Sequence, residues 1–235
     1  MDTLYGRNGL VFWTEKEIRT RQMLADYFVN GMRETLRSQN KAFEFLQVEA
    51  PLLTPINFIN KGYTAADIFI PASRCSDNLD RILFDDLALR PETTMGSYRY
   101  AEWLIEHTEL KTRMPLCVWQ HGKSFRREQD QVTKNMRLKE FYQLEFQAIY
   151  GLTTANDYSV VVIPVVCKLI ADMIGPCRIE ASDRIPDYSE GTTDIVCERN
   201  GMEVCSISKR KDYLGAKVLE VAIGTDRCVY NFLNR

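Results

Sequence analysis

Residues 122–150 read GKSFRREQDQVTKNMRLKEFYQLEFQAIY, and this stretch says most about the fold. It predicts two strands, residues 117–128 and 138–150, joined by a polar loop. Residues two apart in a strand share a face, so the second strand has an apolar and a more polar face. The apolar face carries Tyr142, Leu144, Phe146 and Ala148. The other face carries Phe141, Gln143, Glu145 and Gln147.

The more polar face has an unusual composition for a surface that only meets water. On the first strand, Arg126 and Glu128 share a face in the same way. A half-polar sheet face is ordinarily solvated. Here an arginine, carboxylates, amides and one phenylalanine come together, and this mixture suits a ligand that has a phosphate, an ammonium group and a flat ring.

Four further segments are predicted to be helical. Residues 15–38 begin with a capping box formed by Thr14 and Glu17. Apolar residues then recur every four positions, which indicates an amphipathic helix. They are Leu24, Phe28, Met32 and Leu36. Residues 94–107 and 225–233 are expected to be helices. Residues 158–174 are ambiguous between strand and helix, and we favour a helix with a kink at Pro164.

The remaining segments indicate strands. They are residues 42–48, 82–89, 192–198, 202–208 and 217–223. Asn200-Gly201 between two of them predicts a hairpin turn. Adjacent strands with few helices between them predict an α+β fold, with a mostly antiparallel sheet and packed helices. No linker, repeat or low-complexity segment divides the 235 residues, so we expect a single domain over 1–235.

Composition narrows the classes of function. No apolar run is long enough to span a membrane, and no secretory signal pattern begins the chain. Seven cysteines without a CxxC pair then indicate reduced thiols and a cytoplasmic protein. The two histidines, His107 and His121, neighbour no cysteine cluster, so a zinc site is not expected. A net charge of −2 means that any RNA contact must come from a local basic patch.

Three motifs in order resemble those of class II aminoacyl-tRNA synthetases. The stretch 122–150 resembles motif 2, an FRxE strand, a loop and a returning strand. The unit from residue 15 to Pro51 resembles motif 1. Gly224-Thr225-Asp226-Arg227, after Glu220, resembles motif 3. Together they span nearly the whole chain, and the resemblance implies the class II catalytic fold.

Within that class, the nearest resemblance is to the glycyl enzymes. Residues 89–93, LRPET, resemble a segment of that family. Residues 139–145, KEFYQLE, resemble its REFxQxE strand, and residues 209–213, KRKDY, resemble its xRxDY segment. The resemblance implies activation of glycine with ATP and Mg²⁺ and its transfer to tRNA, in protein biosynthesis.

The resemblance also implies roles for individual residues. Arg126 and Arg227 would be catalytic. Arg126 would bind phosphate and carboxylate oxygens, because a guanidinium can bond two oxygens at once. Phe141 would stack on adenine, with Arg227 on the opposite side of the base. The expected ATP-binding set is Arg126, Glu128, Phe141, Glu203 and Arg227. The candidate ligands of Mg²⁺ are Glu203 and Glu220.

Glycine has no side chain, so its site must bind the ammonium group and exclude larger amino acids. By resemblance, Glu92, Glu145 and Glu220 would surround the ammonium, and Arg210 would help to seat the substrate. Gln143 is expected to belong to the same amino-acid site. The family has a serine where this chain has Ala222, which leaves alanine and serine as competing substrates.

The acceptor is less clearly indicated than the activation step. Only eight residues follow Arg227, so we expect no anticodon reading from this chain, whereas a separate subunit could supply it. Residues 123–139 hold six basic and two acidic residues, and this loop could contact a tRNA acceptor end. Two alternatives remain open: an amino-acid ligase that acts on a carrier protein or small molecule, and a noncatalytic paralogue.

A homodimer through residues 15–55 is also expected. The resemblance implies it, because motif 1 forms the subunit interface in this family. The helix supports it independently, because Tyr27 and Val29 widen its apolar arc beyond one face. We therefore expect this helix to cover its own sheet and also to present apolar surface to a second copy.

Overall fold

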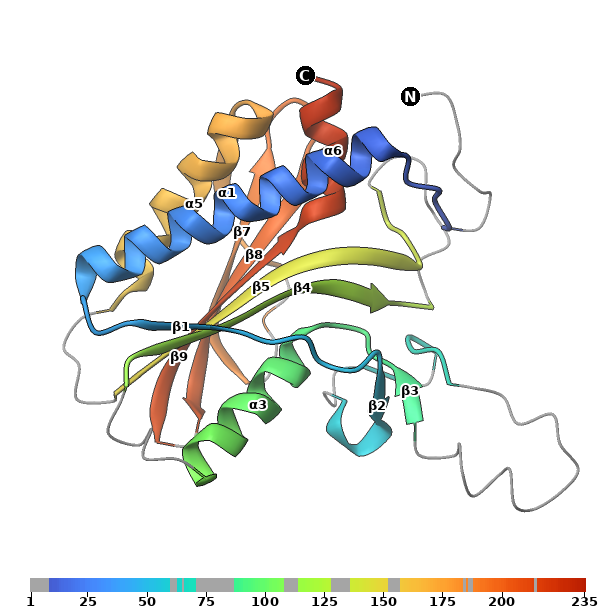
Figure 1. Cartoon of the computed structure of the whole chain (residues 1–235). Coiled ribbons are helices and arrows are strands. Elements are labelled where there is room, and N and C mark those ends of the chain that lie inside the picture. The colour runs from blue at the N-terminus through green and yellow to red at the C-terminus, as the bar shows by residue number, and fades with distance from the viewer. Residues whose placement is uncertain are drawn as a thin grey trace, which may run out of the picture.

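A seven-stranded sheet in the order β1-β4-β5-β9-β8-β7-β6 organises the chain, and a two-stranded sheet, β2-β3, lies beside it (Figure 1). The strands are β1 (Glu44–Gln47), β2 (Leu53–Pro55), β3 (Leu87–Leu89), β4 (Leu116–Phe125), β5 (Glu140–Gly151), β6 (Cys177–Ala181), β7 (Ser189–Cys197), β8 (Met202–Tyr213) and β9 (Ala216–Gly224). The helices are α1 (Glu15–Gln39), the 3₁₀ helix η1 (Ile56–Phe58), α3 (Thr94–His107), α5 (Ser159–Ile174) and α6 (Thr225–Leu233).

The computed structural model describes residues 9–59, 63–64, 66–70, 87–107, 114–127, 136–151, 157–183, 185, 188–213 and 215–235. Among these residues, no helix is both long and apolar enough to cross a membrane.

Strand pairing in the large sheet is antiparallel except at one edge. β1 runs parallel to β4, with Glu44 opposite Leu116. β4, β5, β9, β8, β7 and β6 pair antiparallel, each with its neighbour. The predicted α+β fold with a mostly antiparallel sheet is therefore confirmed.

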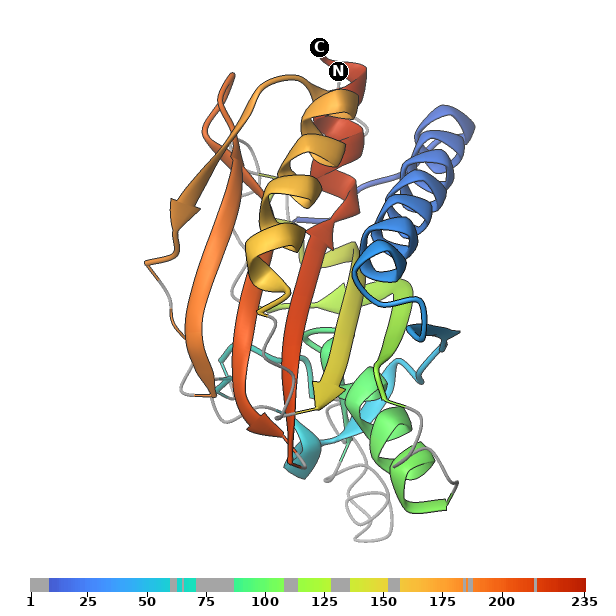
Figure 2. The same cartoon turned by 90° about the vertical axis from the view of Figure 1, so that its left-hand side faces the viewer.

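The helices divide unequally between the two faces of the sheet. α1, α5 and α6 cover one face, and α3 lies on the other, as Figures 1 and 2 show. The main hydrophobic core fills the space between α1, α5, α6 and the sheet. A smaller core joins Tyr98 and Ala101 of α3 to the ends of β4, β5 and β9. Because α3 covers only one end of this face of the sheet, no helix covers the rest of it among the described residues.

The predicted features of α1 are present, with one exception. Thr14 and Glu17 form the capping box. Leu24, Phe28, Met32 and Leu36 are all buried in the main core. Val29 is buried as well, at 6% exposure, and Tyr27 packs against the same core. Val29 therefore presents no apolar surface to a second copy, whereas Tyr27 is only partly buried, and its place in such an interface stays a prediction.

Several predicted elements have shifted ends. The strand expected over 117–128 ends at Phe125. Arg126 N–H still donates to the Lys139 carbonyl beyond that end, and residue 128 lies outside the described residues. β3 confirms the end of the strand expected over 82–89, whereas 82–86 lie outside the described residues. The ambiguous segment 158–174 is the helix α5, which contains Pro164. Gly201, at φ 70°, closes the hairpin between β7 and β8.

Candidate active site

A cavity of about 650 Å³ lies on the open face of the sheet. Its floor is formed by alternate residues of β5, β8 and β9, such as Glu145, Ser208 and Glu220. The intervening residues of the same strands, such as Phe146, Ile207 and Leu219, belong to the main core. Alternation along each strand thus separates the core from the cavity. A cavity of this size suits a ligand as large as a nucleotide with a small second substrate.

The polar face of β5 is not a solvated surface. Gln143, Glu145 and Gln147 are only 9%, 2% and 1% exposed. Both faces of this strand are therefore enclosed, the apolar face by helices and the polar face by the walls of the cavity. Buried polar side chains of this kind are stabilising only when they have partners. Their burial favours the interpretation of this face as a binding site.

Strand register arranges the cavity floor in rows that cross four strands. One row runs from Gln147 through Glu220 and Ser208 to Thr192. The next row, two residues along each strand, runs as follows: Glu145, Ala222, Ser206 and Asp194. The hydroxyls of Thr192 and Ser208 lie 2.9 Å apart. The side chains of the cavity floor next to Glu145 and Glu220 are therefore small or polar.

Three glutamates gather at one end of the cavity, and each accepts a hydrogen bond from a hydroxyl. Tyr63 donates to Glu92 at 3.0 Å, and Thr94 donates to Glu145 at 2.6 Å. The hydroxyl of Tyr98 donates to Glu220. Glu92, Glu145 and Glu220 are 9%, 2% and 7% exposed. The predicted ammonium-binding carboxylates are thus brought together, and we call this region the acidic end.

Burial and mutual repulsion change how these acids titrate. Burial, with the nearby charge of Glu92, raises the pKa of Glu145 to about 7. Burial also raises the pKa of Glu220 to about 7, against the lowering effect of Tyr98 and Arg210. The pKa of Glu92 is raised by burial too, and Arg126 partly offsets this. A cationic ligand would stabilise the ionised forms of all three.

Arg210 lies beside the acidic end within a group of tyrosine rings. Its guanidinium is 3.4 Å from Glu220, and 4.3 Å from the centroid of the Tyr98 ring. The rings of Tyr188 and Tyr213 lie 4.9 and 4.7 Å from it. Cation–π contacts and the ion pair fix its orientation. Arg210 is therefore held against Glu220, as a residue that seats the substrate would be.

Arg126 and Phe141 lie together at a second part of the cavity. The guanidinium of Arg126 is 5.3 Å from the centroid of the Phe141 ring and 5.5 Å from that of Tyr63. Its Nε donates to the carbonyl of Pro91 at 3.1 Å. Arg126 is thus held one residue beyond β4, between the acidic end and Phe141.

Arg227 lines the same part of the cavity from the start of α6. Its Nη1 donates to the backbone carbonyl of Glu203 at 2.7 Å and lies 3.7 Å from the carboxylate of that residue. We call the region of Arg126, Phe141 and Arg227 the basic end. It combines two cations with one aromatic ring.

The two residues predicted to bind a metal lie at opposite ends. Glu220 pairs with Ser208 on β8, five positions from Glu203 on that strand, which corresponds to roughly 16 Å along it. One ion therefore cannot contact both carboxylates. Within the described residues, no group of three or more histidine, cysteine or acidic side chains is arranged to hold a metal ion. Glu128 lies outside the described residues.

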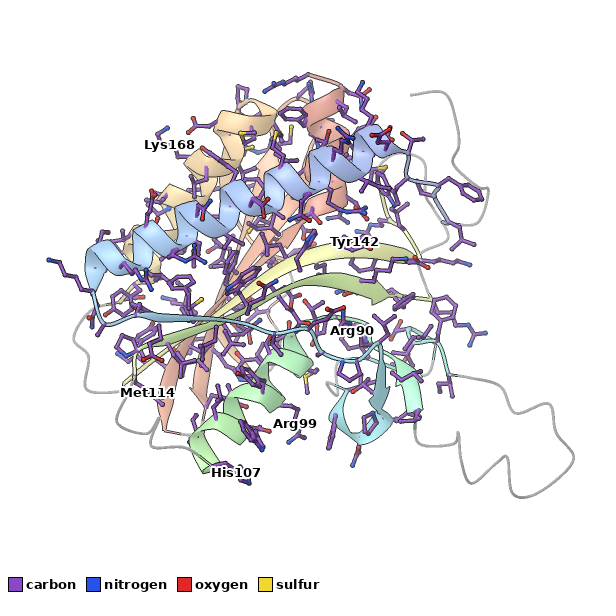
Figure 3. All side chains as sticks on the ribbon, in the orientation of Figure 1. Arg90, Arg99, His107, Met114, Tyr142 and Lys168 are labelled. Atoms are coloured by element: carbon purple, nitrogen blue, oxygen red, sulfur yellow. The ribbon has the colours of Figure 1, made fainter. Side chains whose placement is uncertain are left out.

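Arg90 shapes the segment that carries Glu92. It is 4% exposed and donates to the backbone carbonyls of Ala50 and Lys123 at 2.6 and 2.7 Å. Figure 3 shows it between the large sheet and the β2-β3 region. A Cβ on Gly122 would come within 2.4 Å of its Nη2, so this guanidinium needs the glycine. Arg90 thereby fixes the backbone two residues before Glu92.

Several contributors to the site were missed by sequence reasoning. Thr94 and Tyr98 lie one turn apart on α3, and they bond Glu145 and Glu220. Their spacing of four residues places them on one helix face, which is a signal that the sequence does contain. Tyr63 and Tyr188 lie in irregular segments, where no periodicity marks a role.

The sheet order, the helices and the position of the cavity define the catalytic core fold of class II aminoacyl-tRNA synthetases. A solved structure of prolyl-tRNA synthetase from Cryptosporidium parvum, complexed with halofuginone and AMPPNP, matches 98% of this chain with a TM-score of 0.70 at 12% sequence identity. The match covers 48% of that enzyme, so this chain spans about half its length. No protein-family model matches the sequence, and no curated protein matches it.

Proposed function

We propose that this chain activates an amino acid with ATP, as an aminoacyl-adenylate, and that the amino acid is glycine. One observation carries the proposal: a single cavity has a basic end with Phe141 and an acidic end with three glutamates. An amino acid and ATP together present a ring, phosphates, a carboxylate and an ammonium. The two ends match these groups in kind and in charge.

At the basic end, Phe141 stacks on the adenine ring, and Arg227 covers the other side of the base. Arg126 lies on the side of the basic end that faces the acidic end, where the amino-acid carboxylate meets the α-phosphate. Its guanidinium bonds both anions and stabilises the charge that develops on the phosphorus oxygens. Glu128 is proposed for the same ATP site on sequence grounds alone.

The reaction needs no protein nucleophile. A carboxylate oxygen of the amino acid attacks the α-phosphorus, the bond to the bridging oxygen breaks, and pyrophosphate leaves with the electron pair. Positioning of two anions and stabilisation of charge account for the acceleration. Glu203 fits as a Mg²⁺ ligand, because its half-exposed carboxylate can share an ion with phosphates. Glu220 is less suited to the ion, because it lies at the acidic end, and its Oε1 already accepts from Tyr98 and pairs with Arg210, which leaves Oε2 for the amino acid.

At the acidic end, the ammonium is held by Glu92, Glu145 and Glu220. Arg210 keeps Glu220 in place, and Gln143 lies between this group and Arg227. In their ionised forms, three buried carboxylates favour a small cation over a neutral ligand, and the cation in turn lowers their raised pKa values. A large apolar side chain would also be unfavourable next to these carboxylates, because it would desolvate them without bonding them. This supports glycine as the amino acid.

The decisive experiment is pyrophosphate exchange with each of the twenty amino acids. Glycine is expected to stimulate the exchange most strongly. Exchange with alanine or serine but not with glycine would overturn the specificity and would point to Ala222 as its cause. If no amino acid stimulates exchange, the proposed activity is wrong.

We propose the tRNA acceptor end as the recipient of the amino acid. Because this chain spans 48% of the length of its structural neighbour, transfer to tRNA needs its own test. Charging of a tRNA pool with labelled glycine is expected. Exchange without charging would favour the alternative of a carrier protein or small-molecule acceptor.

A further inference from the structure

Gln147 is a buried residue of the cavity that the proposed chemistry has not used. It lies on β5, two residues beyond Glu145, and is 1% exposed. Its Oε1 is buried and has no hydrogen-bond partner among the residues that the structure describes. A buried acceptor without a partner is costly, so such groups are uncommon and call for an explanation. The residue lines the cavity, which suggests that a ligand supplies the missing donor.

The neighbours of Gln147 identify the kind of donor. Gln147 is the cross-strand partner of Glu220, and directly opposed residues have Cβ atoms about 5 Å apart. Glu145 shares its face of β5, one pleat repeat away. All three side chains offer oxygen acceptors to the same space. A primary ammonium has three N–H donors, and it therefore matches three converging acceptors.

Gln143 provides an instructive contrast. Its Oε1 is also buried without a partner, but it lies on the other side of Glu145 and pairs with Gly224, next to the start of α6. That position faces the basic end, whereas Gln147 faces Glu220. The two amides therefore belong to different parts of the cavity.

We infer that Gln147 is a substrate-binding residue whose side-chain oxygen accepts a hydrogen bond from the ammonium of the amino acid, alongside Glu145 and Glu220. This inference rests on the proposed function and adds a neutral acceptor to the three acids. Glu145, Glu220 and the amide each accept one N–H, and Glu92 contributes its negative charge alone. The neutral amide avoids a fourth negative charge, which would repel its neighbours and raise their pKa values further.

The test replaces Gln147 with leucine, which keeps the bulk and removes the acceptor. In pyrophosphate exchange, the KM for the amino acid is expected to rise about tenfold or more, while the KM for ATP stays within about twofold. The Tm of the free Gln147→Leu protein is expected to equal or exceed that of the wild type, because an unpaired buried acceptor has been removed. Stabilisation by the amino acid should be largely lost.

Gln120→Leu is the matched control for stability. Gln120 is also 1% exposed, but its amide bonds the hydroxyl of Ser97 at 2.8 Å and also the carbonyl of Thr93. Its replacement should lower the Tm, opposite in sign to Gln147→Leu. Gln147→Glu keeps an acceptor, so at pH 8.5 its KM for the amino acid should lie closer to the wild-type value than that of Gln147→Leu.

Two results would overturn the inference. One is an unchanged KM for the amino acid in Gln147→Leu. The other is a lower Tm with equal increases in both KM values, which would indicate a structural role. If the wild type itself exchanges with no amino acid, the proposed function fails and this inference fails with it. If the wild type exchanges and Gln147→Leu behaves identically, only this inference fails.

Discussion

Arg21 of α1 and Asp226 of α6 form a buried ion pair, with Nη1 and Oδ1 3.2 Å apart and side chains only 9% and 3% exposed. The other carboxylate oxygen of Asp226 accepts the backbone N–H of Tyr142 at 2.8 Å. The guanidinium of Arg21 also lies 3.7 Å from the centroid of the Tyr142 ring, and Figure 3 places Tyr142 on the α1 side of β5. Asp226 immediately precedes Arg227, so this pair ties the position of the basic end to α1.

Loss of Arg21 should therefore destabilise the fold. Arg21→Met leaves Asp226 buried without its cation, and removal of one partner of a buried pair costs about 3–5 kcal/mol. We expect a decrease of that size in the free energy of unfolding, measured by urea denaturation. Arg19→Met is the matched control, because Arg19 pairs with Glu15 on the same helix but is 79% exposed. Equal effects of the two substitutions would contradict the importance of the buried pair.

Arg126→Ala should abolish activation without unfolding the protein. The guanidinium lies between the acidic end and Phe141, where the proposed reaction joins the two substrates, so its loss should remove stabilisation of the transition state. We expect kcat for pyrophosphate exchange to fall at least about a hundredfold. Circular dichroism should be unchanged. The neighbouring Arg127 is exposed, so Arg127→Ala should exchange at nearly the wild-type rate.

The acidic end predicts an unusual dependence of stability on pH. Glu145 and Glu220 have pKa values of about 7 in the folded protein, above the ordinary glutamate value of 4.5. Between these values, the folded state binds more protons than the unfolded state. These two groups therefore contribute stability that is fully present below pH 4.5 and is lost as pH rises through 7. The Tm of the free protein should be lower at pH 8 than at pH 5.5, and less so in Glu145→Gln.

The bound ammonium should reverse this trend. Glycine binding at the acidic end, as proposed, needs ionised glutamates, so it should release protons and strengthen as pH rises toward 8. Each released proton gives up to about a tenfold gain in affinity per pH unit below the relevant pKa. Calorimetry in buffers of different ionisation enthalpy measures this release. Binding that weakens from pH 6 to pH 8 would argue against an ammonium at the acidic end.

A homodimer through residues 15–55 remains a prediction, although Val29 does not contribute to it. The exposed apolar residues of α1 are Ile18 and Met23, at 48% and 43% exposure. Sedimentation at micromolar concentration should give twice the chain mass of 27.2 kDa. The double variant Ile18→Asp, Met23→Asp should shift the equilibrium toward single chains if α1 forms the interface. A wild-type mass of one chain would exclude the dimer.

The sequence correctly predicts which side chains of β5 face the core and which face the cavity. Alternation of Phe141, Gln143, Glu145 and Gln147 with apolar residues shows which side chains share a face, because period 2 is a local property of a strand. β6 could not be found in this way. Its residues are mostly exposed, as an edge strand allows, so no apolar alternation marks it. The exposure of Val29 was misjudged because helical periodicity does not reveal that α1 also packs against α5.

The partners of the three glutamates could be predicted only in part. The resemblance brought Glu92, Glu145 and Glu220 to one site, and the structure places them at one end of the cavity. The hydroxyls that bond them come from α3 and from the segment around Tyr63, which are distant in sequence. Such contacts depend on how α3 lies across the sheet, which no single-sequence pattern encodes. The same holds for the wide separation of Glu203 from Glu220.

The alternation along β5 and β9 has a consequence for how this protein can evolve. A deletion or insertion of one residue within either strand would rotate every later side chain to the opposite face. Phe146 would then enter the cavity, and Glu145 would enter the core, so folding and binding would be lost in one event. Changes of length are therefore confined to the connections between strands. Descendants of this chain can vary in loop length, but the spacing from Phe141 to Gln147 and from Glu220 to Arg227 must stay fixed.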